Sequence, residues 1–466
     1  MPEIRNDKTQ HCASTVLTNM CTVKVALLFF SFAVQCLSCP FPPPCLCDAR
    51  SPTVYCRSLN MTSLPKINPA NGSWTVFLNN NKLRHLPSNA FFGIKVHMLV
   101  LDNNEIVKVD DHAFNGSEDS LIFLELAGNK LSSLPSAIAR LQNIMSLSVS
   151  QNPLTDLDQE VIANISKSLL FLDFGSSEML KFPRSIKLLK TLASIDLSDV
   201  TFTSLPEDAF QPFVNSLNVL GLHNTSLAEL PSSINLLNSL QNLKLDRNRN
   251  LSAAAISKSV PNGLPGLTDA TFQNNGLSTL PNIFLKASHL YIITVLDEPI
   301  SSLGDDCFTP NFSSNFQVMR MNNTQLTRVP SCLSSVESIK RLEITYNNIS
   351  SIEEDDFMNM KNLNILVLSW NPITNVSDKA FERNDALSYL IFEQTKLQYI
   401  PRAIQNLKSP QLLNLSGCHI QCTCENLGWM KQWKRRPDYF QIVGECWNLR
   451  MNLMTFIKGE IPKCPN

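Results

Sequence analysis

One short pattern, L-x-L-x-x-N-x-L, recurs about fifteen times in this 466-residue chain and constrains its fold more than any other feature. A clear copy runs from Leu124 through Asn129 to Leu131. Copies begin 23 residues apart at the closest, as from Val76 to Leu99, and 27 at the widest, from Leu243 to Ala270. Their first positions are Val76, Leu99, Leu124, Leu147, Leu172, Ile195, Leu220, Leu243, Ala270, Ile293, Met319, Leu342, Leu366, Leu390 and Leu413.

A single copy cannot fold alone. About six buried apolar side chains, worth roughly 1.5–3 kcal/mol each, do not offset about 1.5 kcal/mol of conformational entropy for every residue that is ordered. Neighbouring copies must therefore stack and share one core. The L-x-L alternation puts Leu124 and Leu126 on one face of a short strand and Glu125 on the other. The predicted fold class is α/β, a horseshoe-shaped solenoid of about fifteen repeats with a concave parallel sheet.

The asparagine of the pattern is predicted to form a buried ladder, because its amide can satisfy backbone groups in the turns. Smaller residues replace the asparagine at Ser177, Thr225, Thr324, Thr395 and Cys418. Val200 and Glu298 fit neither group, and the sequence predicts local irregularity there.

Cysteines gather at both ends of the repeats. Cys39, Cys45, Cys47 and Cys56 precede the repeats, and the pattern C-x-C-x21-C-x17-C follows them from Cys422. With the repeats, these patterns resemble the extracellular leucine-rich-repeat family with N- and C-terminal cysteine caps, which includes Slit, chaoptin, connectin and the Toll-type ectodomains. The resemblance covers nearly everything after residue 38. It implies a binding protein without naming a ligand.

The resemblance also implies a disulfide pattern. The implied pairs are Cys39–Cys47, Cys45–Cys56, Cys422–Cys446 and Cys424–Cys464. Spacing alone leaves three pairings open for the four N-terminal cysteines, and a zinc site is the competing interpretation. Cys307 and Cys332 fall at the same convex position of adjacent copies, which favours a further disulfide over two buried thiols. Cys418 is predicted to be a buried, unpaired thiol.

Residues 1–38 are interpreted as a secretory signal peptide. Lys24 precedes a ten-residue apolar run from Val25 to Val34, which is too short to span a membrane. The long leader is explained by a start at Met20 or by a signal anchor. The predicted domains are the signal peptide, an N-terminal cap (39–64), the repeats (65–420) and a C-terminal cap (421–466). No transmembrane segment is expected after cleavage, so the protein is expected to be secreted.

Eleven N-x-S/T sequons predict N-glycosylation in the secretory pathway. They stand at Asn60, Asn71, Asn115, Asn164, Asn224, Asn250, Asn311, Asn322, Asn348, Asn375 and Asn414. Asn224, Asn322 and Asn414 map to the concave strand region, where a glycan would block or frame a binding surface.

The sequence predicts no enzyme and no cofactor. It carries no G-x-S-x-G, no phosphate-binding G-x-x-x-x-G-K and no H-E-x-x-H, and its seven histidines are scattered. A net charge of −1 gives no reason to expect nucleic acid as a partner. The acid pair Asp173 and Asp196 falls on adjacent concave strands, and a solvated acidic patch is the simpler interpretation.

The candidate binding face lies in the later repeats, where concave positions turn apolar and aromatic. Such exposed Trp, Tyr and Arg residues favour a protein contact, although strand-end aromatics can instead pack on their neighbours. Its residues are Arg341, Tyr346, Ile365, Val367, Trp370, Tyr389 and Ile391. A basic run in the C-terminal cap, Lys431, Lys434, Arg435 and Arg436, is either a polysaccharide contact or a solvated helix face.

The hypothesis that follows is a secreted, glycosylated protein that recognises another extracellular protein, or a second copy of itself, through its concave face. The alternatives are a matrix component that self-associates and an innate-immune protein that binds microbial glycans.

Overall fold

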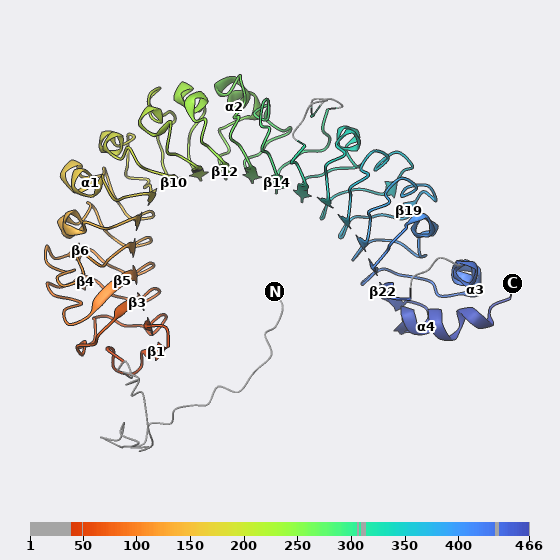
Figure 1. The fold of residues 1–466 in the computed structure, drawn as a ribbon, viewed down its shortest axis with the longest axis horizontal. Coiled ribbons are helices and arrows are strands. Elements are labelled where there is room, and N and C mark those ends of the chain that lie inside the picture. Colours follow the sequence, from red (N-terminus) through yellow and green to blue (C-terminus); the bar gives the residue numbers. More distant parts are fainter. Residues whose placement is uncertain (1–38, 49, 305–306, 309–313, 434–437, 466) are drawn as a thin grey trace, which may run out of the picture.

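The computed structural model describes residues 39–465 except 49, 305–306, 309–313 and 434–437. The predicted signal peptide, residues 1–38, lies outside the described residues. The chain forms an arc, with a row of strands on the inner, concave side and short helices and turns on the outer, convex side (Figure 1). The solenoid fold predicted from the repeats is therefore correct.

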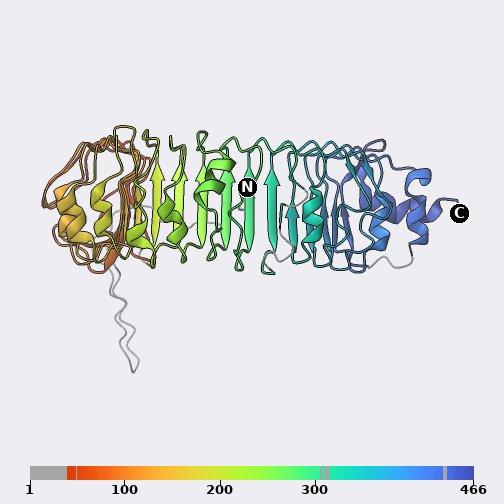
Figure 2. The same ribbon diagram turned by 90° about the horizontal axis from the view of Figure 1, so that it is seen from above.

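The concave side is one eighteen-stranded sheet in which neighbours in sequence are neighbours in space (Figure 2). All its pairings are parallel except the first, between β1 and β2. Its strands are β1 (Leu46–Asp48), β2 (Thr53–Tyr55), β3 (Ser73–Phe77), β5 (Lys95–Val100), β7 (Phe123–Glu125), β8 (Ser146–Ser148), β9 (Phe171–Phe174), β10 (Ser194–Ser198), β11 (Val219–His223), β12 (Asn242–Asp246), β13 (Asp269–Gln273), β14 (Ile292–Leu296), β15 (Val318–Asn322), β16 (Arg341–Glu343), β18 (Ile365–Val367), β20 (Tyr389–Ile391), β21 (Leu412–Asn414) and β22 (Gln441–Val443).

The register places equivalent positions of successive copies side by side, so that Leu124 lies opposite Leu147 and Leu147 opposite Leu172. Leucines that alternate along each strand point into the core and are buried. Side chains between them point to the concave face. Each concave position therefore forms a row across the sheet, and residues that share a row touch although they are more than twenty positions apart.

The convex side carries one short helical turn or helix in many copies. Proline precedes the regular 3-10 turns, because it fixes φ and its missing N–H is not needed at a helix start. The convex elements are η1 (Ser136–Arg140), α1 (Gln159–Ile165), η2 (Arg184–Leu188), η3 (Gln211–Phe213), η4 (Ser232–Leu236), α2 (Ala253–Ser259), η5 (Ser331–Ser335) and η6 (Arg402–Asn406), with two small parallel pairs, β4 (His85–Leu86) with β6 (Lys108–Val109) and β17 (Ser351–Ile352) with β19 (Asn375–Val376).

The asparagine ladder has the role predicted for it. The Asn129 amide donates to the carbonyls of Leu126 (2.9 Å) and Leu101 (3.1 Å), and its Oδ1 accepts from the N–H of Ile106 at 3.0 Å. Buried backbone groups of two copies are thus satisfied by one side chain. The smaller substitutes Thr225 and Thr324 donate to the next asparagine instead.

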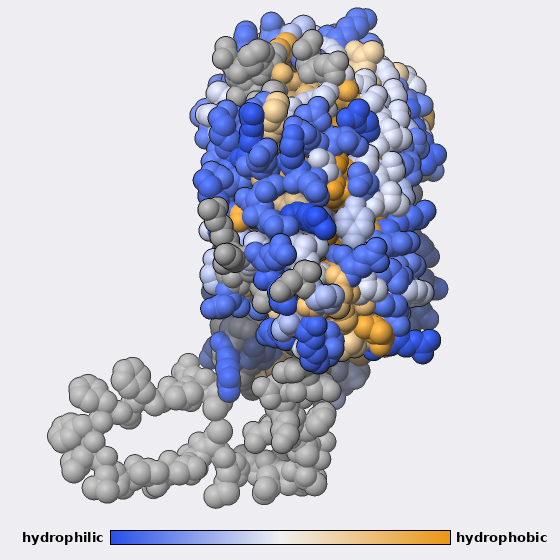
Figure 3. Space-filling view, turned by 90° about the vertical axis from the view of Figure 1, so that its right-hand side faces the viewer, coloured by the Kyte–Doolittle hydropathy of each residue, from blue (hydrophilic) through white to orange (hydrophobic). Residues whose placement is uncertain are grey.

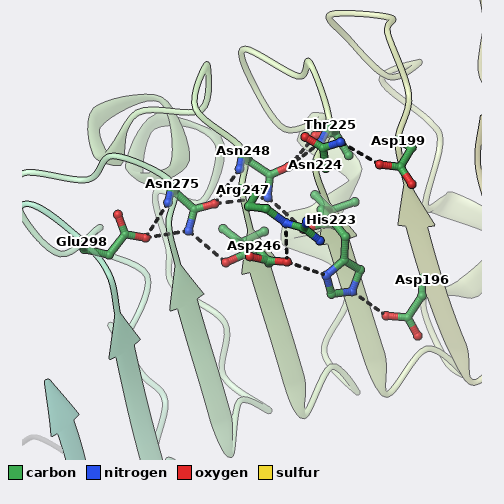
Figure 4. A network of polar contacts seen from close by, with 12 residues as sticks. Asp196, Asp199, His223, Asn224, Thr225, Asp246, Arg247, Asn248, Asn275 and Glu298 are labelled. Carbon is green, nitrogen blue, oxygen red and sulfur yellow. Dashed lines mark hydrogen bonds and ion pairs between the residues drawn. The ribbon is translucent and has the colours of Figure 1, made fainter. Parts of the chain in front are cut away.

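The irregularity predicted at Glu298 and Val200 is wrong. Glu298 is 1% exposed and continues the ladder (Figure 4). Its Oε1 accepts from the backbone and side-chain N–H groups of Asn275 at 2.9 and 2.8 Å, and its Oε2 from the N–H of Leu277 at 2.8 Å. Val200 is buried, and the strands before both residues keep full register with their neighbours.

The departure from regularity lies one copy earlier than Val200. Ser177, predicted to be a ladder residue, is exposed, and Ser176 is buried in its place. Gly175 has φ +141°, and a Cβ there would lie 1.8 Å from the carbonyl oxygen of Ser198. The turn after Leu172 therefore closes differently because only glycine allows so close an approach.

Both ends of the solenoid are covered by disulfide-bonded caps. The N-terminal cap holds Cys39–Cys47 and Cys45–Cys56, and the C-terminal cap holds Cys422–Cys446 and Cys424–Cys464. These are the pairs that the family resemblance implies. The C-terminal end presents a mostly hydrophilic surface (Figure 3). The elements of the C-terminal cap are α3 (Cys424–Leu427), η7 (Gly428–Gln432), β23 (Glu445–Cys446), β24 (Met451–Asn452), α4 (Leu453–Gly459) and η8 (Ile461–Lys463).

A fifth disulfide, Cys307–Cys332, joins the convex sides of two adjacent copies. Cys418 is buried and unpaired in the part of the chain that the structure describes. Its Sγ donates to the carbonyl of Phe392 and lies 3.1 Å from the hydroxyl of Thr395, so it serves as a ladder residue.

Candidate binding surface

Each copy turns away from its strand through one residue with left-handed backbone, four positions after the first position of its sequence pattern. We call this residue the turn position. Every copy has it except the one that begins at Leu172. The turn positions are Asn80, Asn103, Gly128, Gln151, Asp199, Asn224, Arg247, Asn274, Asp297, Asn323, Tyr346, Trp370, Gln394 and Gly417, with φ between 50° and 74°.

Most turn positions hold residues that accept left-handed backbone readily, since Asn, Asp and Gly visit it at low cost. Side chains at neighbouring turn positions contact each other along the edge of the concave face. Asn224 Nδ2 donates to Asp199 Oδ1 at 2.6 Å, and Asn323 Nδ2 donates to Asp297 Oδ1 at 2.7 Å. The turn positions thus form a row along the rim of the concave face, interrupted at the copy that begins at Leu172.

Tyr346 and Trp370 are exceptions to this polar row. They occupy adjacent turn positions with φ of 54° and 59°, where a bulky side chain is a conformational outlier. Their rings stack with centroids 5.2 Å apart and planes 9° apart. They remain 54% and 47% exposed. Two large aromatic rings are therefore held in water at some cost in backbone conformation.

The other predicted face residues lie on the strands beside this pair. Ile365 lies opposite Tyr389, and Val367 opposite Ile391, and all four are half-buried. Arg341 and Arg320 both pair with Glu343, the latter at 3.1 Å. The structure thus brings the seven predicted residues onto three adjacent strands, β16, β18 and β20, and the turns that follow two of them.

The earlier half of the concave face is polar and includes a chain of ion pairs (Figure 4). His223 Nε2 lies 3.1 Å from Asp196 Oδ1, and its Nδ1 lies 3.8 Å from Asp246 Oδ2. Arg247 Nε donates to Asp246 Oδ2 at 3.1 Å. The hydrogen bond to Asp196 raises the pKa of His223, because it favours the charged imidazolium.

Toward the N-terminal end of the same sheet, the carboxyl groups of Asp102, Glu125 and Asp173 lie close together, and no described basic side chain forms a salt bridge with them. Burial, followed by the negative charge of Glu125, raises the pKa of Asp102 to about 7. Burial also raises the pKa of Glu125 and of Asp173. Asp173 Oδ2 accepts from the hydroxyls of Ser148 and Ser150 at 2.7 and 2.6 Å. Asp173 and Asp196, the acid pair noted in the sequence, are both half-buried.

Comparison with known proteins agrees with this architecture. The leucine rich repeat family model matches residues 94–154, 314–373 and 361–420. Bovine asporin is 25% identical over 163 residues, which is 34% of this chain and 43% of asporin. A leucine-rich-repeat protein of Leptospira interrogans has a similar structure (TM-score 0.55, 22% identity, 83% of this chain and 94% of that one). So does Drosophila Toll in its complex with Spatzle (TM-score 0.55, 18% identity, 80% of this chain and 51% of that one).

These matches and the structure agree on the fold. The described chain is a leucine-rich-repeat solenoid closed at both ends by disulfide-bonded caps. The segment aligned with asporin spans less than half the length of that relative. Within the described parts of this leucine-rich-repeat chain, every helix is too short or too polar to span a membrane. The same described parts hold no group of three or more His, Cys, Asp or Glu side chains arranged for a metal ion.

Most of the predicted glycosylation sites lie on the surface of the leucine-rich-repeat solenoid. Asn115, Asn322 and Asn414 are half-buried, and Asn311 lies outside the described residues. The exposed sites are Asn60, Asn71, Asn164, Asn224, Asn250, Asn348 and Asn375. Of the basic run, Lys431 donates to the carbonyl of Cys464 at 3.0 Å, and Lys434, Arg435 and Arg436 lie outside the described residues.

Sequence reasoning found the residues of the aromatic face but not the reason they stand out. It grouped Tyr346 and Trp370 with strand residues, whereas both lie in the turns after the strands. The sequence contains the signal that distinguishes them. The residue four positions after the first position of each pattern copy is mostly Asn, Asp, Gly or Gln in the other copies. It also missed Asp102 and Glu125, whose carboxyl groups interact between adjacent copies.

Proposed function

We propose that this protein is a secreted, N-glycosylated recognition protein that binds another extracellular protein through the later half of its concave face. The observation that carries the proposal is the stacked, exposed pair Tyr346 and Trp370. Large aromatic side chains that stay about half exposed in a left-handed backbone conformation contribute little to the core, and such outliers cluster at binding sites. Trp and Tyr are also the residues most enriched among interface hot spots.

An extracellular setting is supported by several independent features. The described chain has five disulfides, which persist in oxidising compartments and are rare in the cytosol. Seven of its sequons are exposed and open to modification. Two proteins of similar structure form complexes with other proteins: Drosophila Toll with Spatzle, and mouse RP105 with MD-1.

The neighbours of the aromatic pair give the proposed surface a mixed character. The half-buried Ile365, Val367 and Ile391 provide an apolar floor, and Arg341 provides a charged edge. Interfaces commonly combine an apolar centre with such a polar rim. Sequons at Asn348 and Asn375 belong to the same copies, and the sequon at Asn322 belongs to the copy before them. Glycans at these positions would frame the surface and limit the approach of a partner.

The test begins with a binding screen of the glycosylated protein against multimerised extracellular domains, itself included, and a glycan array. For the partner found, Tyr346→Asn and Trp370→Gln should each weaken affinity at least tenfold in surface plasmon resonance. Tyr439→Asn and Trp447→Gln, exposed aromatics of the C-terminal cap, are the matched controls. Unchanged affinity in both face variants would refute this surface assignment. A hit on glycans alone would transfer the assignment to glycan recognition.

A further inference from the structure

A second part of the concave face, separate from the aromatic pair, has the properties of a built site. A hollow of about 680 Å³ opens over β7–β11. Its walls carry Glu125, Asp173, Asp196, Ser198 and His223. The two aspartates lie directly opposite each other on the neighbouring strands β9 and β10. Like charges placed this way destabilise a sheet, so their retention requires an explanation.

The hydrogen bonds in the hollow leave one oxygen of each aspartate unused. Asp173 accepts both of its serine hydrogen bonds on Oδ2, and Asp196 accepts from His223 on Oδ1. Asp173 Oδ1 and Asp196 Oδ2 receive no hydrogen bond from the described residues. Ionised carboxylates only accept, so a ligand that completes this site must donate.

A third acceptor points to the same ligand chemistry. Ser198 lines the hollow, its side chain is only 9% exposed, and its hydroxyl has no hydrogen-bond partner in the described structure. A buried polar group without a partner costs about 1–3 kcal/mol. The hydroxyl is free to accept a hydrogen bond from a group that enters the hollow.

The backbone makes room for this arrangement at one position. Gly221 occupies the place on β11 beside Asp196. A Cβ there would lie 1.9 Å from Asp196 Oδ1 and 2.6 Å from His223 Nε2. Any other residue would displace the ion pair that fixes the Asp196 carboxylate, so glycine keeps the site open and oriented.

An apolar wall stands beside the acidic groups. Phe123 and Phe171 line the same hollow, and Phe171 is 43% exposed. Aromatic faces attract cations, and the alkyl stems of long basic side chains pack on apolar surface. Of the basic groups on the hollow, Arg247 pairs with Asp246 and His223 with Asp196, while no described basic side chain forms a salt bridge with Glu125 or Asp173.

We propose that this hollow binds a guanidinium or ammonium group carried on an alkyl chain, held between Asp173 and Asp196 with its stem against Phe171. Two sources share this chemistry: an arginine or lysine side chain presented by a protein, and a free amine. A cation there would relieve the repulsion between the aspartates and would donate to their unused oxygens and to Ser198. The inference stands independently of the aromatic surface.

The test is titration calorimetry of the glycosylated protein with N-acetyl-arginine amide, N-acetyl-lysine amide and a short peptide with one central arginine. N-acetyl-citrulline amide, which has nearly the shape of the arginine probe without its charge, is the matched ligand control. We expect the cationic probes to bind and citrulline to bind at least tenfold more weakly. Binding of the peptide alone would assign the source to a protein segment, and binding of the single-residue probes would allow free amines as well.

Variants locate the binding. Asp173→Asn and Asp196→Asn should each weaken it at least tenfold, and Gly221→Ala should abolish it, whereas Asp269→Asn on the concave strand β13 should have no effect. Tyr346→Asn should also leave it unchanged, so failure of this proposal and failure of the aromatic surface are distinguishable. The proposal is overturned if no cationic probe binds at millimolar concentration, if citrulline binds equally well, or if neither aspartate variant weakens binding. The comparison of the arginine and citrulline probes uses the unsubstituted protein. It therefore remains informative even if one of the variants does not fold.

Discussion

At the scale of single residues, the turn positions differ from the buried strand positions, because their side chains belong to the protein surface. The residue there contributes little to the core, and its side chain lies on the rim of the concave face. Asn, Asp and Gly satisfy the backbone requirement cheaply, whereas Tyr346 and Trp370 do not. The two aromatics gain about 0.5–1.5 kcal/mol from stacking, which roughly offsets the backbone cost.

This balance gives a prediction for Tyr346→Asn. Relief of the strained backbone and loss of the stacked ring should nearly cancel, so the free energy of unfolding should change by less than about 1 kcal/mol. Partner affinity should nevertheless fall at least tenfold. Thermal denaturation and surface plasmon resonance on the same preparation check both parts. A large loss of stability would instead make Tyr346 a structural residue.

Asp102 gives a prediction for pH. Its pKa is raised from 3.8 to about 7 in the folded protein, so the folded state binds this proton more tightly than the unfolded state does. The contribution of this carboxyl group to stability should therefore fall as pH rises from about 4 to about 7 and then level off. Asp102→Asn, which keeps the acceptor for the Ala127 N–H, should reduce that fall by about 1–2 kcal/mol after allowance for solvent screening. Urea denaturation at pH 5 and 7.5 measures the difference, and an equal fall in the variant would contradict it.

At the scale of elements, each ladder residue connects its own turn to the preceding one. An asparagine does so with both donors and an acceptor, as Asn129 shows. Glu298 does so with acceptors alone, because its longer side chain reaches three N–H groups of the preceding copy. The ladder is therefore defined by its backbone partners and not by one side-chain type.

Glu298→Gln tests this interpretation. The side-chain amide of glutamine would place its own N–H group against the N–H donors of Asn275 or Leu277. A buried donor would then lack an acceptor, at a cost of about 1–3 kcal/mol. We expect a lower melting temperature by differential scanning calorimetry. The exposed Glu382 supplies the control substitution Glu382→Gln, which should have no effect. Equal melting temperatures for both variants would mean that the Glu298 carboxylate is not required.

Much of the repeat architecture could be predicted from the sequence, because the fixed period assigns each residue a place within its copy. Leu124, Asn129 and Cys418 each occupy the place that counting assigns them. Counting failed at Ser177, where Gly175 alters the turn, and at Glu298, where a longer side chain performs the same task by different bonds. It also could not foresee that Asp173 accepts from Ser148 and Ser150, since those contacts depend on side-chain conformation across strands.

At the scale of the whole molecule, a solenoid makes contacts only between neighbouring copies, so its ends and any weak junction decide its integrity. The caps protect the ends with two disulfides each. The Cys307–Cys332 disulfide lies within the array and joins the convex sides of two copies, 25 residues apart in sequence. We infer that it secures a junction whose convex segment is longer than usual.

Replacing both cysteines of this pair by serine should therefore destabilise the later copies most. A loop of 25 residues corresponds to about 3 kcal/mol in the chain-entropy description. We expect faster amide hydrogen exchange in β14–β16 than in β7–β9, measured by mass spectrometry. An exchange pattern unchanged from that of the unsubstituted protein would show that this junction does not depend on the disulfide.

The row of turn positions has a consequence for how such a molecule changes over generations. A substitution there alters a rim side chain without entering the core or the ladder, so selection for a new partner need not be accompanied by selection for restored stability. Random libraries confined to Arg247, Asn323 and Gln394 should yield folded, secreted variants at high frequency. The concave rim of this protein can in that sense change a few neighbouring side chains at a time while the core stays the same.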